Sequence, residues 1–150
     1  MPNGQFPGPL HPRTTRRSNH QYFFYDKHHK AGYSEDAQWL PDMTHDQEFA
    51  VFDLADFHDF SNEKGDLYGL HLSPELIIRN WGTRKEQVAE FPIPQRAHPW
   101  HGYPCWPITR LKRDKKELKY PAPKDALEKM KDAGLLTENQ RKRLVRGKHL

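Results

Sequence analysis

One proline-dense stretch of this chain sets the tightest limit on what it can fold into. Residues 91–107 read FPIPQRAHPWHGYPCWP, with five prolines in seventeen positions. Proline offers no backbone N–H, so this density excludes a regular helix and a central strand. The stretch also holds Trp100, Tyr103 and Trp106, and large aromatic side chains are normally buried. We therefore expect an ordered loop at 98–107 that these rings anchor on a sheet.

The composition indicates one small folded domain. The chain has 150 residues, of which 35% are hydrophobic, and a length of this order is typical of a single domain. Eight Phe, four Trp and six Tyr are unusual for a disordered chain. No apolar run is long enough to span a membrane. The lone Cys105 excludes an internal disulfide and fits a reducing compartment, so we expect a cytoplasmic protein.

Four apolar segments favour β-strands, at 22–25, 49–54, 67–72 and 76–79. The second of them has an ambiguous period. A strand would place Ala50, Phe52 and Leu54 on one face, whereas a helix would align Phe49, Phe52 and Asp56 in one stripe. We favour a strand at 49–54 followed by a turn or short helix, with 67–72 antiparallel to it.

Two further patterns predict helices. Thr83 and Glu86 match a capping box before Val88, and they predict a helix of about two turns that Pro92 closes. At the C-terminus, one helix begins after Pro123 and stops at Gly134, and a second begins at a capping box, Thr137 with Gln140, and stops at Gly147. Two short helices with a tight joint predict a helical hairpin.

Residues 126–148 read ALEKMKDAGLLTENQRKRLVRGK. This segment resembles the short C-terminal helical hairpins, often called SHOCT, that are appended to many bacterial proteins. Those hairpins usually carry an acidic–aromatic pair where this chain has Gln140 and Arg141. The resemblance implies attachment to a larger context and no chemistry, and we recognise no family in the rest of the chain.

The expected fold class is α+β, with a small antiparallel sheet, an ordered Pro/Trp-rich loop and a C-terminal helical hairpin. Residues 1–20 are rich in Pro, Gly and Arg and are expected to form a flexible basic arm, because they bury too little to offset about 1–2 kcal/mol of backbone entropy per residue. Residues 21–122 form the small α+β domain, and 123–150 form the basic hairpin that packs on it.

Charge is divided along the chain. Residues 42–66 hold eight acids and one base, whereas residues 110–150 hold fourteen bases and six acids. A basic end of this kind suits an acidic partner surface, often nucleic acid. Alternatively, the acidic and basic segments face each other within the fold and partly cancel.

Two clusters have the residue types of metal sites. His98, His101 and Cys105 have spacings found in zinc sites, with a fourth ligand from His71 or His58. We favour instead a loop whose histidines hydrogen-bond carbonyls while the tryptophans pack. The second cluster could bind Mg²⁺ or Mn²⁺ if it were helical, but we favour a solvated acidic rim; its members are Asp53, Asp56, His58 and Asp59. We expect no cofactor, with zinc as the open alternative.

The leading hypothesis for function is a small, non-enzymatic interaction or adaptor protein that binds a macromolecular partner, most simply another protein. The alternatives are a nucleic-acid-binding protein, using the basic arm and hairpin, and a His/Cys metal-dependent enzyme. We assign no catalytic residue. The expected partner-binding residues are Trp100, Tyr103, Trp106, Arg141, Arg143 and Arg146.

Overall fold

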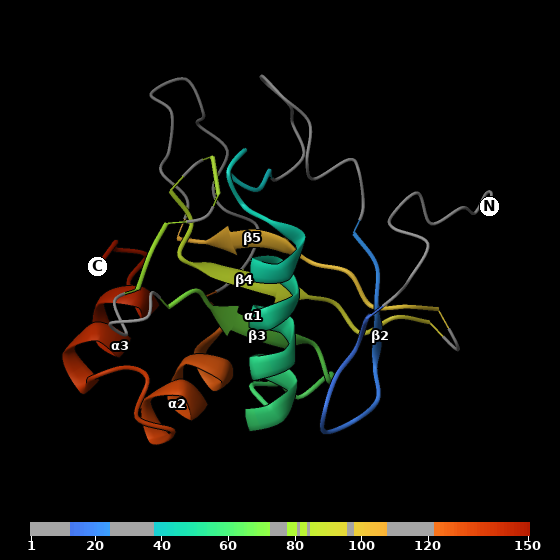
Figure 1. Cartoon of the computed structure of the whole chain (residues 1–150). Helices are drawn as coiled ribbons and strands as arrows, with labels where there is room; N and C mark the ends of the chain where they lie inside the picture. Colours follow the sequence, from blue (N-terminus) through green and yellow to red (C-terminus); the bar gives the residue numbers. More distant parts are fainter. Residues whose placement is uncertain are drawn as a thin grey trace.

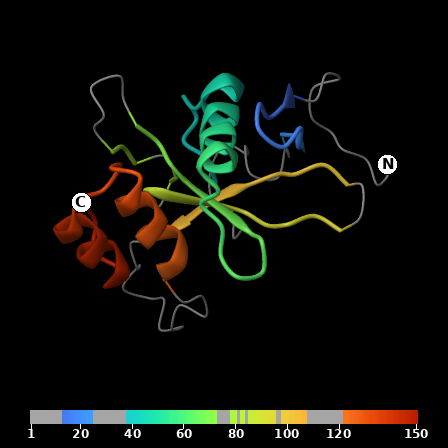
Figure 2. The same ribbon diagram turned by 90° about the horizontal axis from the view of Figure 1, so that it is seen from below.

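The computed structural model describes residues 13–24, 38–72, 78–80, 82–83, 85–95, 98–107 and 122–150. Its elements are, in chain order, β1 (Arg13–Thr14), β2 (Gln21–Tyr22), α1 (His45–His58), β3 (Leu67–Leu70), β4 (Val88–Phe91), β5 (Tyr103–Trp106), α2 (Lys124–Asp132) and α3 (Glu138–Val145). They form two small antiparallel sheets and three helices, which confirms the α+β fold class. In Figures 1 and 2, α1 crosses one face of the larger sheet, between β2 on one side and the α2–α3 pair on the other.

The larger sheet has the order β3–β4–β5, with β4 in the centre. The strand expected at 67–72 is confirmed as β3, but it pairs with β4 rather than with residues 49–54. The two-turn helix expected after Thr83 is wrong, because its apolar residues form β4. Val88, Ala89 and Phe91 have no exposed surface, and a central strand buried on both faces explains this better than one face of a short helix.

Helix α1 replaces the strand expected at 49–54, which is therefore wrong. Its N-terminus has a reciprocal capping box: the Gln47 N–H donates to Thr44 Oγ1 at 3.0 Å, and the Thr44 N–H donates to Gln47 Oε1 at 2.9 Å. Val51, Phe52 and Ala55 are buried against the sheet, the spacing of one helix face. Asp59 ends the helix in the left-handed conformation, at φ 55°.

The proline-dense stretch is partly a strand. Residues 103–106 form β5, which has β4 as its one neighbour among the described strands and so lies at the edge of the sheet. Pro104 is tolerated there because an edge strand has a side without ladder hydrogen bonds. Of the strand expected at 76–79, Ile78 forms an isolated bridge with Leu72, and residues 73–77 lie outside the described part.

The N-terminal hairpin of β1 and β2 packs beside this stretch. The Trp100 N–H donates to the Gln21 carbonyl at 2.7 Å, and the Phe23 N–H donates to the Trp100 carbonyl at 2.9 Å. Tyr22 has no exposed surface, and Thr15 is 1% exposed. Within residues 13–20, Thr15 is buried, whereas Thr14 and residues 16–19 are exposed. The flexible arm expected over residues 1–20 stays a prediction, and residues 1–12 and Tyr25 lie outside the described part.

Helices α2 and α3 form the expected hairpin. Gly134 and Gly147 follow the two helices at φ 82° and 76°, left-handed values that glycine adopts without strain. The Thr137–Gln140 capping box is also confirmed. The hairpin is joined to the sheet by a hydrogen bond from Trp106 Nε1 to the Leu144 carbonyl, at 2.6 Å, and by Lys129 Nζ, which donates to the Ser61 carbonyl at 3.0 Å.

Candidate functional site

The two tryptophans expected to bind a partner lie in the core, and Tyr103 is half-buried. Trp100 and Trp106 are 7% and 8% exposed. Trp100 contacts the His20 ring, with centroids 4.8 Å apart, and Trp106 is bonded to α3. Tyr103 is half-buried and hydrogen-bonds Glu90. These side chains hold the fold together, so the tryptophans do not form an exposed contact surface.

The residues with zinc-like spacing are not joined into a metal site in the described part of the chain, where no group of three or more His, Cys, Asp or Glu side chains is placed to hold an ion. Burial, reinforced by the carboxylates of Glu90 and Glu86, raises the pKa of the Cys105 thiol. A thiol of raised pKa is a poor nucleophile. The expectation that the protein binds no metal stays a prediction.

Two carboxylates of the acidic cluster, Asp53 and Asp56 on α1, are hydrogen-bonded to the N-terminal arm. Asp53 accepts hydrogen bonds from Arg16, from its N–H at 2.9 Å and from its Nε at 2.6 Å. The same guanidinium lies 4.8 Å from the centre of the Phe57 ring. Asp56 accepts the Ser18 N–H at 3.1 Å. The cation-bearing segment that docks here is thus the arm, and not the C-terminal hairpin.

The acidic and basic segments do not face each other as ion pairs within the residues that the structure describes. Residues 122–150 touch the acidic segment through Lys129, which donates to the carbonyl and hydroxyl of Ser61, each at 3.0 Å. Residues 110–121 belong to the basic segment but lie outside the described part. The positive charge of the hairpin therefore stays on its surface.

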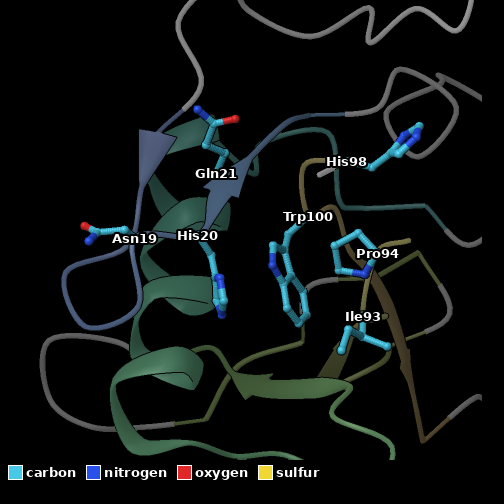
Figure 3. Close-up of a pocket in the computed structure, with 7 residues that line it drawn as sticks. All are labelled: Asn19, His20, Gln21, Ile93, Pro94, His98 and Trp100. Carbon is cyan, nitrogen blue, oxygen red and sulfur yellow. The ribbon is translucent and has the colours of Figure 1, made fainter. Parts of the chain in front are cut away.

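A cavity of about 410 Å³ lies between residues 19–21 and the 93–100 stretch. Figure 3 shows His20 facing Trp100, with Pro94 and Ile93 on the other side of the indole. The side chains of Asn19, Gln21 and His98 point away from this row (Figure 3). The lining of the cavity is thus mixed, with the His20 imidazole beside the apolar side chains of Ile93 and Pro94.

A second cavity, of about 510 Å³, is lined mostly by polar and charged residues, among them the half-buried Glu90. Burial and the nearby Asp66 charge raise the pKa of Glu90, against hydrogen bonds from Tyr103 and Tyr68. Asp66 itself accepts the Ile93 N–H at 2.9 Å and Asn62 Nδ2 at 3.0 Å. The sequence pattern did not indicate the Glu90 carboxyl group, because it predicted a helix at this position. As a strand residue between buried Ala89 and Phe91, it would have been expected to face the opposite way from them.

The most exposed charged feature of the hairpin lies on α3. We use the term α3 basic face for Asn139, Lys142, Arg143 and Arg146, which are all exposed. They are spaced i, i+3, i+4 and i+7, so they follow one side of the helix. Arg143 donates to the His149 carbonyl at 2.6 Å, a bond that leaves its charge uncompensated. Of the expected basic contact residues, Arg143 and Arg146 belong to this face.

Arg141 belongs instead to a network of ion pairs between residues of the hairpin. Its guanidinium pairs with Glu138, and also with Glu128 at 3.3 Å. Lys131 pairs with Glu128 at 2.8 Å and with Asp132 at 3.5 Å. Three of the four acids of residues 122–150 are thereby compensated. No close ion pair joins Lys142, Arg143 or Arg146 to an acid of the described residues. The α3 basic face therefore carries three of the six bases of residues 122–150 that form no such ion pair, and the other three are Lys124, Lys129 and Lys148.

The opposite side of α3 is firmly attached. Leu144 has no exposed surface, and its carbonyl accepts both Trp106 Nε1 at 2.6 Å and the Gly147 N–H at 3.0 Å. The C-terminal residue is also tied down, because the Leu150 N–H donates to Gln87 Oε1 at 2.9 Å. The buried side of α3 thus packs on the sheet, and the α3 basic face is exposed.

No helix in the described ranges combines the length and the apolar character that a membrane crossing requires. Comparison with protein-family models, with curated proteins and with solved structures found no match to this chain. The likeness of residues 126–148 to SHOCT hairpins therefore stays a prediction.

Proposed function

We propose that this chain is a small interaction protein that binds an acidic macromolecular partner through the α3 basic face. The observation that carries the proposal is the separation of charge on the hairpin. Glu128, Asp132 and Glu138 are paired with Lys131 or Arg141, while Lys142, Arg143 and Arg146 are exposed and form no close ion pair with an acid of the described residues. Cations arranged in this way attract an acidic surface and steer its approach.

The mounting of α3 supports the same proposal. A binding residue is more effective when its backbone is held in place, because less conformational entropy is lost on association. The capping box at Thr137 and the bond from Trp106 to Leu144 hold both ends of the helix. A cytoplasmic location, which we also propose, fits the lone Cys105.

Fluorescence anisotropy with two labelled probes, a polyglutamate peptide and a duplex DNA, tests this proposal. Any basic protein binds polyanions at low salt, so the decisive comparison is between two variants of equal charge. Lys142→Gln, Arg143→Gln and Arg146→Gln together should weaken binding to both probes far more than the control does. The matched control replaces Lys64, Lys85 and Lys124, which are exposed elsewhere, by Gln.

The control variant should bind within about twofold of the unmodified protein, since separated exposed charges act nearly independently across a Debye length of about 8–10 Å. Equal loss in both variants would show that binding reflects overall charge rather than the α3 basic face, and the proposal would fail. Circular dichroism confirms that each variant is folded before it is titrated.

A further inference from the structure

We infer that the acidic partner is double-stranded DNA and that the α3 basic face enters its major groove. This inference rests on the proposed function and goes further, because it chooses between an acidic protein and a nucleic acid. The choice follows from which side chains the fold buries, from the dimensions of the exposed helix and from the chemistry of its four outward residues.

Burial of the aromatic residues argues against a protein partner. Protein interfaces depend on buried aromatic anchors at their centre, with charges at the rim. Here Trp100 and Trp106 are in the core. The large hydrophobic residues that are exposed in the described ranges are Phe57, Ile93 and Leu150; Phe57 is covered on one face by Arg16. None of these belongs to the α3 basic face, which lacks the apolar centre that a stable protein interface requires.

The shape of the surface fits a DNA groove. α3 is the second helix of a pair, and residues 133–137 join it to α2 by a short turn. From Asn139 to Arg146 the helix rises by roughly 10 Å, at about 1.5 Å per residue, which matches about three base pairs of B-DNA at 3.4 Å each. The major groove of B-DNA is about 12 Å wide and admits an α-helix, whereas that of A-form RNA is too narrow.

The residue types of the face divide into two roles. The carboxamide of Asn139 can pair with the N6 and N7 edge of adenine, and it lies in the first turn, the part of a second helix that contacts base edges. Lys142, Arg143 and Arg146 follow on the same side and are suited to phosphate oxygens or, for arginine, to guanine. Asn139 therefore supplies sequence preference, and the three cations supply most of the affinity.

The experiment compares four probes at 150 mM salt by anisotropy: duplex DNA, duplex RNA and single-stranded DNA of one sequence, and polyglutamate. The duplex DNA sequence comes from selection of a randomised pool by the unmodified protein. We expect duplex DNA to bind at least tenfold more tightly than the other three probes. Replacing Lys142, Arg143 and Arg146 by Gln should reduce the slope of log K against log salt by about 3, near 0.9 for each phosphate that the protein no longer neutralises.

Asn139→Ala separates reading of sequence from attraction by charge. Alanine is a good helix former at this exposed position, so the variant should fold; it should lose the preference for the selected sequence and keep the salt dependence. Equal affinity for the four probes, or tighter binding of polyglutamate, overturns the DNA inference. If the α3 triple variant alone loses binding in that case, the proposed function stands; if the Lys64, Lys85 and Lys124 control loses it equally, both fail.

Discussion

Trp106 links the edge of the sheet to α3, and its replacement by Ala tests the packing of the whole hairpin. The indole is 8% exposed, and burial of a Trp side chain removes roughly 150–250 Å² from water. At about 25 cal/mol per Å² this area corresponds to about 4–6 kcal/mol. The hydrogen bond to the Leu144 carbonyl adds about 1 kcal/mol. Since Gly147 still donates to that carbonyl, no buried acceptor is left unpaired. Area counted against an extended chain is an upper bound because the unfolded chain already buries part of it, so we expect Trp106→Ala to cost about 3–5 kcal/mol.

Urea unfolding followed by circular dichroism measures this loss without relying on tryptophan fluorescence. With a slope of about 2 kcal/mol per molar urea, the midpoint should fall by roughly 2 M. Trp106→Phe keeps a ring and removes the donor, so it should cost about 2 kcal/mol, and hydrogen exchange should rise in α3 more than in β4. A loss below about 1 kcal/mol for Trp106→Ala would refute the reasoning, because it would show that the ring contributes little to the packing of the hairpin.

The remaining predictions concern the arm and the pH response. Asp56→Ala should cost about 1–3 kcal/mol because it leaves the part-buried Ser18 N–H without its acceptor. Asp53→Ala removes the ion pair with the exposed Arg16, so it should cost at most about 1 kcal/mol, and less in 1 M salt. If urea titrations gave the reverse order, they would contradict this account of the arm. Burial lowers the pKa of His71 in the folded protein below 6.5, its ordinary value. The unfolded chain therefore binds a proton at His71 more readily than the folded protein does. As the pH falls below 6.5, protonation favours the unfolded chain and the free energy of unfolding decreases. His71→Gln should reduce the difference in urea midpoint between pH 7.5 and pH 5.5, and an unchanged difference would count against it.

The two capping-box patterns show why the helices were predicted unevenly. Thr137 with Gln140 forms the box that its sequence predicts, while Thr83 with Glu86 does not. After Thr137 the chain is polar, with Leu144 buried on one side, so local capping determines the structure. After Thr83 the residues Val88 to Phe91 are almost entirely buried as a central strand, and tertiary packing outweighs a local signal that is worth about 1 kcal/mol.

At α1 the reverse holds: the capping box forms, and the strand expected at 49–54 is wrong. Thr44 and Gln47 form a true capping box, but the run of Phe and Val after it favours a strand by propensity, and propensity is a weak guide where packing decides. Packing also explains why only part of the α3 basic face could be predicted from the sequence. The charge of Arg143 and Arg146 can be read from the sequence, but the burial of Trp106 and the pairing of Arg141 depend on which elements meet in the fold.

The contact between β2 and Trp100 has a consequence for the rate of folding. Two backbone hydrogen bonds join Trp100 to Gln21 and Phe23, and the loop that they close spans about 80 residues, so its closure has an entropic cost. Pairings so distant in sequence raise the contact order of a domain and slow its folding. The α2–α3 hairpin, built from local contacts, should therefore form early, and the β2 pairing should be among the last steps, which would appear in stopped-flow refolding as late protection of the Trp100 amide.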